Sequence, residues 1–416
     1  MRLAVRDLAI VLGISWLARA AFIAAIGDAQ SNDVGHWLGA LAAQDAGRNP
    51  YETGVLNWPP FWLQVIVGVD YLSNLANVSF WSALRLYLVL VESALVGALY
   101  LTLVSLVGAP RDAVRRALLV GIALNPVAII LICQHGNSDV QIGLLVTLAT
   151  AALIAYGRTR DVVFWLCGCL LIGVGVLAKT APLVLAPLLA PGARLVSRPG
   201  RLLGMALLLG PAALGLSVIA ALVPIAVWDH VVGYRSYRGF FGLAGIVEEF
   251  GGIDDSMYAT FFTVAVVALV CWLGYRLWRE PSLAPETLFL LVATVFMTVV
   301  AFGAGYGAHY AYWFMPSLIA TYVLLDDAWR RLLLVGYAIA AVTYTIDYAF
   351  LPFLGAFATE IVGTPSWLEE TSEFLSDPEM LVLVRLPLFF VYVVVIAAGV
   401  RRLSREFAYR RDLPAS

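Results

Sequence analysis

Long apolar runs separated by short polar connections make up most of this chain. Such runs suit the hydrocarbon core of a bilayer, where backbone polar groups must find partners within their own segment and therefore form helices. The pattern predicts an all-α polytopic membrane protein with about twelve spans. We place these spans near residues 8–26, 83–108, 117–133, 139–156, 162–178, 181–193, 202–227, 258–275, 286–303, 311–325, 332–350 and 381–400.

The composition supports the same interpretation. Of the 416 residues, 62% are hydrophobic and 13% are charged, and the mean hydropathy is +0.88. No soluble core could hide so much apolar surface, so we predict a single membrane domain over residues 1–416. The net charge of −2 gives no field that would attract nucleic acid. The four cysteines show no zinc-ligand spacing, and we interpret them as small buried side chains: Cys133, Cys167, Cys169 and Cys271.

Basic residues cluster in alternate connections between the predicted spans. The positive-inside rule makes these connections cytoplasmic, together with both termini and a basic tail over residues 403–416. The clusters are Arg2/Arg6, Arg111/Arg115/Arg116, Arg158/Arg160, Arg194/Arg198/Arg201, Arg276/Arg279, Arg330/Arg331 and Arg401–Arg411. On this topology the apolar segment 59–76 is a re-entrant or interfacial helix, because counting it as a span would invert every later connection.

Seven of the 26 basic residues remain outside these clusters, in exoplasmic loops or in the outer halves of spans. Charges at membrane depth are costly and usually serve a site. As a group they suit the phosphate of a lipid-linked ligand, although each one could equally snorkel or form a local ion pair. The seven are Arg19, Arg48, Arg85, Lys179, Arg235, Arg238 and Arg385.

Chemically rich residues gather in the connections assigned to the exoplasmic side, including a first loop over residues 27–82 and a large loop over residues 228–257. All four histidines fall there: His36, His135, His230 and His309. No two of them have the spacing of metal ligands on one helix, so we expect no cofactor, although these histidines and nearby acids offer donor types for a divalent metal. The aromatic residues of these loops fit either an interfacial belt or platforms for sugar rings.

Four stretches on this side, taken in order over residues 28–320, resemble motifs of the GT-C superfamily of membrane glycosyltransferases. The likeness is strongest to the catalytic subunit of GPI mannosyltransferase I and its prokaryotic relatives. The stretches are Asp33 with GRNPY at 47–51 and NWPP at 57–60, LNP at 124–126 with HGNSD at 135–139, KTAP at 179–182, and HYAYWFMP at 309–316. Asp33 stands alone where the family often has paired acids, and His135 replaces the arginine of the eukaryotic enzymes, which leaves the donor sugar and the acceptor open.

The resemblance implies an inverting transfer of a hexose, with mannose the family's example, from a polyprenyl- or dolichyl-phosphate donor to a glycolipid or glycan acceptor on the exoplasmic face. An acceptor hydroxyl has a pKa far above 7, so a carboxylate must take its proton. The lipid phosphate is already a good leaving group, and it needs cations to stabilise its growing charge.

The resemblance also suggests roles for individual residues. Asp33 is the candidate general base, with a helix N-cap as the alternative. Candidates for binding the donor phosphate are Arg235, Arg238, His309 and Lys179, with anchoring at the membrane surface as the alternative for the two arginines. Candidates for holding the sugar and acceptor are His36, Tyr51, Asn57, His135, Asn137, Asp139, Tyr234 and Tyr310. His135, Asn137 and Asp139 could equally cap the helix that begins at residue 139.

Two other classes of protein stay open at this stage. A secondary transporter shares the plan of many spans with both termini inside, although no internal repeat is evident here. A ligase or polymerase would use lipid-diphosphate glycans instead. The exoplasmic face belongs to the cell membrane in a prokaryote and to the endoplasmic reticulum in a eukaryote. The eukaryotic relative works with a small accessory membrane subunit, and the sequence leaves open whether this chain has one.

Overall fold

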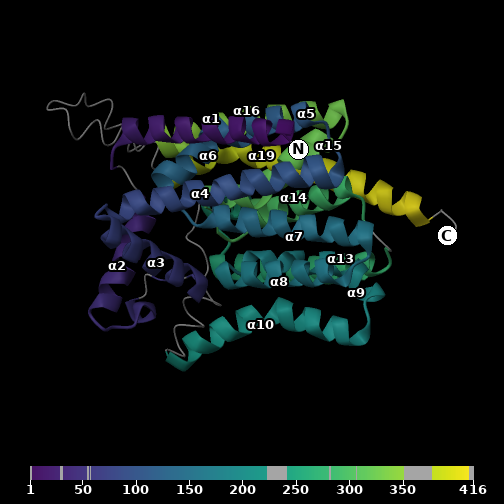
Figure 1. Cartoon of the computed structure of the whole chain (residues 1–416), viewed down its shortest axis with the longest axis horizontal. Helices are drawn as coiled ribbons and strands as arrows, with labels where there is room; N and C mark the ends of the chain where they lie inside the picture. The colour runs from purple at the N-terminus through teal and green to yellow at the C-terminus, as the bar shows by residue number, and fades with distance from the viewer. Residues whose placement is uncertain are drawn as a thin grey trace.

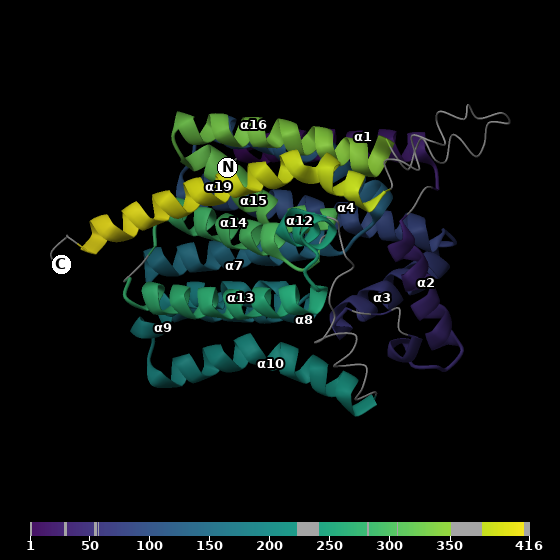
Figure 2. The same cartoon turned by 180° about the vertical axis from the view of Figure 1, so that it is seen from behind.

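The computed structural model describes residues 2–28, 31–53, 56, 58–222, 241–280, 283–305, 307–350 and 377–411. In this part of the chain every regular element is a helix, and most helices lie side by side in one bundle (Figures 1 and 2). In chain order the elements, with η for short 3-10 or π turns, are α1 (Arg2–Ile26), α2 (Asn32–Asp45), η1 (Pro50–Thr53), α3 (Pro60–Ala76), α4 (Phe80–Leu101), η2 (Thr102–Val107), α5 (Arg111–Leu118), η3 (Leu119–Ala123), α6 (Pro126–Ile130), η4 (Leu131–His135), α7 (Asp139–Thr159), α8 (Val162–Ala178), η5 (Ala181–Leu189), α9 (Ala190–Leu195), α10 (Arg198–Leu222), α12 (Gly242–Gly251), α13 (Asp255–Trp278), α14 (Pro285–Phe302), η7 (Ala308–Tyr310), α15 (Ala311–Leu324), α16 (Asp327–Tyr344), η8 (Thr345–Phe350) and α19 (Pro378–Arg411).

Among the described residues, seven helices are long and apolar enough to cross a membrane, or eight if one bent pair counts as a single span. The chain is therefore an all-α, multi-pass membrane protein. The bent pair is Arg111–Ala123 with Pro126–His135, which meet at 47°. Pro126 lacks an N–H for the preceding turn, and Asn125 caps the new helix by accepting from the Val127 N–H at 2.9 Å.

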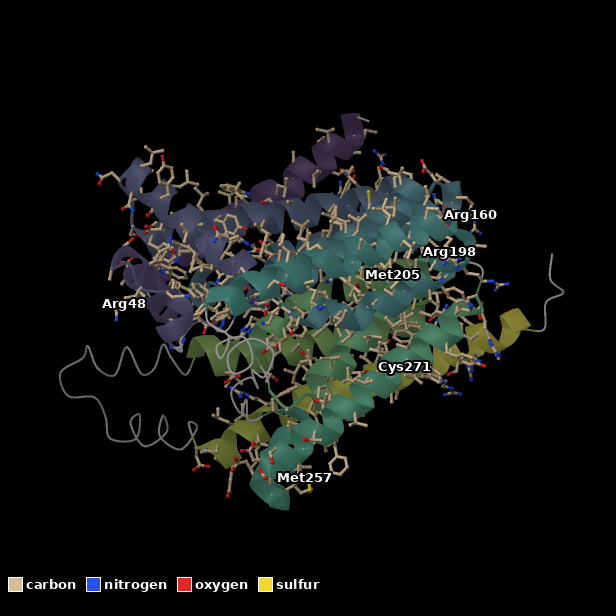
Figure 3. All side chains as sticks on the ribbon, turned by 90° about the horizontal axis from the view of Figure 1, so that it is seen from below. Arg48, Arg160, Arg198, Met205, Met257 and Cys271 are labelled. Carbon is tan, nitrogen blue, oxygen red and sulfur yellow. The ribbon has the colours of Figure 1, made fainter. Side chains whose placement is uncertain are left out.

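The outer helices turn large apolar faces away from the bundle. In the most apolar 18-residue stretch of each helix, only 11% of the residues of α10 and 6% of those of α13 are buried. Cys271 lies exposed on α13, and Cys167 lies exposed on α8, so the prediction of four buried cysteines is wrong for these two. Figure 3 shows Met205 on α10 and Cys271 on α13. Apolar surface of this extent is what a bilayer covers.

The helices α2 and α3 lie together at one end of the bundle (Figure 1). Trp37 of α2 packs edge-on against Trp62 of α3, with ring centroids 5.0 Å apart, and against Trp58, at 5.9 Å. Both Trp37 and Trp62 are almost fully buried. Buried tryptophans contribute large apolar areas, so this cluster fixes the position of α2 and of the acid near its start.

Charged residues distinguish the two ends of the bundle. Figure 3 shows Arg48 at the end that holds α2, and Arg160 and Arg198 at the opposite end. Both chain termini lie away from α2 (Figure 1). Arg160 and Arg198, from two of the connections predicted to be cytoplasmic, are thus separated along the bundle from Arg48 and α2.

Among the described residues, two of the unassigned arginines form ion pairs between helical segments of the bundle. Arg19 of α1 donates to Glu92 of α4 at 2.6 Å, and both side chains are 1% exposed. Tyr312 of α15 donates to the same carboxylate at 2.6 Å. Arg385 of α19 contacts both oxygens of Asp347 at 2.8 Å. Each of these two arginines therefore has a local ion pair, one of the roles that the sequence left open for it.

Removing one partner of the Arg19–Glu92 pair is expected to destabilise the bundle by on the order of 3–5 kcal/mol, because a buried charge is left uncompensated. Glu92→Leu and Arg19→Leu should each lower the unfolding temperature of the detergent-purified protein. The double variant removes both charges and should lose less than the two single changes added together. Additive losses would contradict a direct charge pairing.

Candidate functional site

Six polar residues from distant parts of the chain meet at the end of the bundle that holds α2. Asp33 comes from the first turn of α2, and Asp139 from the first turn of α7. The others come from the turns between elements: His135 and Asn137 before α7, Lys179 after α8, and His309 in η7. Helices that begin or end at one face of a bundle bring such turns together, as the predicted topology requires.

Asp33 is held by residues of the connection before α7. The Asn137 side-chain amide donates to Asp33 Oδ2 at 2.9 Å, and His135 Nε2 lies 3.4 Å from the same oxygen. The N-cap of α2 is Ser31, whose hydroxyl donates instead to the His135 carbonyl at 2.7 Å. The alternative role of Asp33 as an N-cap is therefore wrong, and its carboxylate lies in the favourable field of the helix N-terminus.

The Asp33 carboxyl is strongly biased toward its ionised form. Burial alone raises its pKa, but the hydrogen bond and charge interaction with His135 and the hydrogen bond from the Asn137 amide together outweigh burial. The net result is a pKa well below the usual range of an aspartate. Asp33 is therefore a carboxylate at neutral pH.

Asp139 lies beside this carboxylate and is completely buried. Lys179 Nζ contacts its two oxygens at 3.0 and 3.1 Å, and His309 Nε2 lies 3.4 Å from Oδ2. Asn137 joins the two acids, since its amide donates to Asp33 and its Oδ1 accepts from the Asp139 backbone N–H at 3.2 Å. Asn137 thus orients Asp33 and accepts from the first N–H of α7, one residue before the N-cap Ser138, and its binding of a sugar stays a prediction.

Aromatic rings complete the site. The imidazoles of His135 and His309 stack with their centroids 4.9 Å apart. Tyr310 stacks on Trp313 at 4.2 Å, and Lys179 Nζ lies 4.4 Å from the centre of the Tyr310 ring and 5.1 Å from that of Trp313. A lysine held between a carboxylate and two rings is fixed in one orientation, toward the buried acid.

Lowering the pH is expected to destabilise the site through His309. Burial lowers its pKa well below the ordinary value, the charges of Lys179 and His135 lower it further, and Asp33 opposes them. The folded protein therefore keeps His309 neutral, whereas the unfolded chain takes up a proton below about pH 6.5. Stability is present above that pH and is lost below it, by up to about 1.4 kcal/mol per pH unit.

The measurement is the unfolding temperature between pH 7.5 and pH 5.5, values that bracket the unfolded pKa of about 6.5, with a chelator present so that no metal competes for the imidazole. His309→Gln should flatten the acid side of this profile, and His36→Gln should leave it unchanged. Equal slopes in all three proteins would show that His309 is not the group that titrates.

The backbone of the turn before α7 requires a glycine. Gly136 has φ of +71°, and a Cβ added to it would lie 2.4 Å from the ring of Trp81. Arg85 stabilises the same turn region by donating to the carbonyls of Cys133 at 2.7 Å and Gly27 at 2.8 Å. The sequence analysis did not identify Gly136 and Trp81 as positioning residues, although a glycine between His135 and Asn137 was a visible signal.

Other predicted site residues lie elsewhere. Tyr51 is buried and donates to the Trp58 carbonyl at 3.2 Å, so it packs the first loop and is not available to a sugar. His36 follows Asp33 on α2 but forms no hydrogen bond or ion pair with the cluster among the described residues. Tyr310 lies at the edge of the site. Three others, Tyr234, Arg235 and Arg238, and also Asn57, fall outside the described residues.

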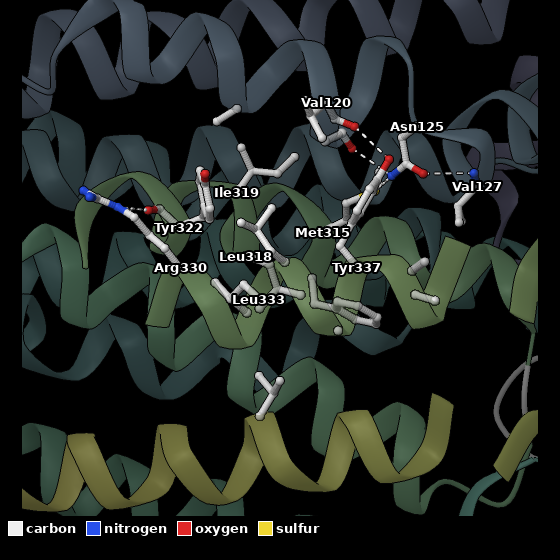
Figure 4. Close-up of a pocket in the computed structure, with 18 of the residues that line it drawn as sticks. Val120, Asn125, Val127, Met315, Leu318, Ile319, Tyr322, Arg330, Leu333 and Tyr337 are labelled. Atoms are coloured by element: carbon white, nitrogen blue, oxygen red, sulfur yellow. Dashed lines mark hydrogen bonds between the residues drawn. The ribbon is translucent and has the colours of Figure 1, made fainter. Parts of the chain in front are cut away.

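A separate cavity of about 440 Å³ lies between η3, α15, α16 and α19. Figure 4 shows Arg330 and Tyr322 toward one end of it and Asn125 toward the other. Most of its lining is apolar, with Met315, Leu318 and Leu333 among the lining residues. It does not include the six polar site residues, but it reaches Ala311, which follows His309 and Tyr310 at the start of α15.

Comparison with protein-family models and with curated proteins finds no match for this chain.

Proposed function

We propose that the chain is an inverting glycosyltransferase that moves a hexose from a polyprenyl- or dolichyl-phosphate donor to a glycolipid or glycan acceptor. The observation that supports this most is that an ionised carboxylate, Asp33, lies in one cluster with the ammonium group of Lys179 and the imidazoles of His135 and His309, at one end of a membrane bundle. Transfer of a sugar from a lipid-linked donor needs a carboxylate and a cation together at the membrane interface. It needs no soluble cofactor.

Asp33 has the geometry of a general base. Asn137 and His135 both engage Oδ2, and the described residues supply no hydrogen bond to Oδ1. Oδ1 is the atom proposed to accept the acceptor hydroxyl's proton while the oxygen attacks the anomeric carbon. The strongly lowered pKa of the substrate-free site is unfavourable for a base. An anionic donor bound beside Asp33 would raise this pKa, so the carboxylate becomes a better base when the donor is present.

The leaving phosphate is proposed to lie against Lys179 and His309. Two donors of the ammonium group serve Asp139, which leaves a third N–H for a phosphate oxygen. Asp139 neutralises much of the lysine charge, so Arg235 and Arg238 remain proposed donors of further positive charge. Bond formation at the acceptor oxygen and cleavage of the anomeric carbon–phosphate oxygen bond occur on opposite faces of the sugar, with inversion.

Two further features belong to this proposal. The positive-inside rule and the helical elements found at each of the predicted runs support about twelve spans, with cytoplasmic termini and the site on the exoplasmic face. In this arrangement α3 is an interfacial helix. The apolar cavity that ends near Ala311 has room for part of a hydrocarbon chain, which suits a lipid-linked substrate.

The test is turnover of the purified protein in liposomes with a panel of polyprenyl-phosphate hexoses and candidate glycolipid acceptors. The proposal predicts transfer of labelled sugar from at least one monophosphate donor, with inversion at the anomeric carbon. Transfer only from lipid-diphosphate oligosaccharides would indicate the ligase class. Solute uptake without any transfer would indicate a transporter.

A further inference from the structure

We propose that Asp33, His135 and His309 form a binding site for a divalent transition metal of the zinc class. The candidate ligand atoms of these three residues all lie within 4.8 Å of one another. They come from α2, from the turn before α7 and from η7, so the bundle itself assembles the set. Two imidazoles with one carboxylate are donors that suit zinc, and also cobalt and manganese.

The distance between two of the donor atoms fits a metal site. His135 Nε2 lies 3.4 Å from Asp33 Oδ2. Ligand bonds of about 2.0–2.1 Å in a tetrahedral zinc site place neighbouring donor atoms about 3.3–3.4 Å apart. The observed separation of these two atoms therefore matches one edge of such a site.

His309 has the surroundings of a metal ligand. Its Nε2 faces the buried Asp139 carboxylate at 3.4 Å, while its Nδ1 is buried and has no hydrogen-bond partner among the described residues. A carboxylate that holds one ring nitrogen while the other binds a metal is the common arrangement around histidine ligands. Asp139, itself fixed by Lys179 and by the Asn137 cap, is then a positioning residue for His309.

The site is accessible enough for an ion to enter. The side chains of Asp33, His135 and His309 are 24%, 13% and 14% exposed, whereas Asp139 is fully buried. Three protein ligands leave a fourth tetrahedral position open, as in catalytic rather than structural zinc sites. The identity of the group that fills this position rests on the proposed function, which supplies a phosphate oxygen of the lipid-linked donor.

Asp33 can serve both roles. The metal would take Oδ2, the oxygen that already faces His135, and Oδ1 would remain for the acceptor proton. The sequence does not predict this metal site, because no two histidines share a helix at ligand spacing. The ligands instead come from separate elements, and only the packing of the bundle brings them together.

The experiment is metal binding by the full-length protein in nanodiscs, after chelator treatment and reloading with Co²⁺ and then Zn²⁺. We expect about one ion per chain, in keeping with one three-ligand set, visible d–d absorption of four-coordinate Co²⁺, and loss of that absorption when Zn²⁺ is added. His135→Ala and His309→Ala should each weaken Zn²⁺ binding at least tenfold, and Asp139→Asn about 10–100-fold. His36→Ala, which removes a histidine on the same face, should bind like the wild type.

Zn²⁺ should also raise the unfolding temperature of the wild type and of His36→Ala but not of His135→Ala. Because each protein is compared with itself with and without Zn²⁺, a variant of low stability still gives a result. Equal Zn²⁺ binding in all variants, or no binding by the wild type, would overturn the metal site. Sugar transfer by a protein that binds no Zn²⁺ would refute the metal site and leave the transferase. Zn²⁺ binding without sugar transfer from any donor would refute the transferase and leave the metal site.

Discussion

Asp33→Asn is expected to lower the rate of sugar transfer by about 10²–10⁴-fold, the usual contribution of a general base. Asparagine has nearly the same shape, and its carbonyl oxygen can still accept from the Asn137 amide that now donates to Asp33 at 2.9 Å. The change therefore removes the proton acceptor and keeps the local packing. Turnover is measured at saturating donor and acceptor, so that the loss appears in kcat.

The matched control is Asp45→Asn, at the exposed C-terminal end of the same helix, α2. It removes the same charge from the same element and should leave transfer unchanged. Both variants should unfold close to the wild-type temperature. Near-normal kcat in Asp33→Asn would remove this residue from the reaction and with it the proposed mechanism.

Lys179→Met is expected to have the second largest effect, a loss of about 10²–10³-fold in transfer together with a lower unfolding temperature. The loss of transfer follows from removing a donor aimed at the leaving phosphate. The loss of stability follows because Asp139, 0% exposed, would keep a buried charge without its main partner.

A double variant separates these two causes. Lys179→Met with Asp139→Leu removes the charge along with its partner, so the unfolding temperature should recover while transfer stays low. Arg198→Met removes a basic residue at the opposite end of the bundle (Figure 3) and should change neither quantity. Normal transfer in the double variant would show that Lys179 only stabilises the fold.

Much of the fold could be predicted because apolar runs in a membrane chain have one structural solution. Each predicted run contains helical structure in the described residues. The bend in the run at 117–133 was not predicted, although Pro126 was visible, because the sequence does not show which proline a neighbouring helix will accommodate. The exposure of Cys167 and Cys271 was not predicted for a related reason. The lipid-facing side of a spanning helix is as apolar as its buried side, so the sequence does not show which side faces the bundle.

The site was predictable as a set of residues on one face but not as a set of contacts. The order of the motifs placed Asp33, His135, Lys179 and His309 on that face, whereas their distances depend on helix packing between segments far apart in the chain. The pairing of Lys179 with Asp139 is such a case. Lys179 was a candidate for binding the phosphate and Asp139 for binding the sugar, and the sequence did not predict that they contact each other.

The unassigned cations show the same limit. Counting charges by topology set Arg19 and Arg385 among seven cations that could bind a phosphate or form local ion pairs, and it could not choose between these roles. Their partners, Glu92 and Asp347, are acids within helical segments of the bundle, and each uses the nearby guanidinium. An acid and a base on different helices can be matched only when the neighbours in the bundle are known.

The most direct test of the central claim is an experimental map of the protein bound to a non-hydrolysable polyprenyl-phosphonate hexose. The account predicts the phosphonate within hydrogen-bonding distance of Lys179 and on the His309 side of the site, with the anomeric carbon facing Asp33 Oδ1. Density for the phosphonate at the opposite end of the bundle, beside Arg116 and Arg330, would contradict it.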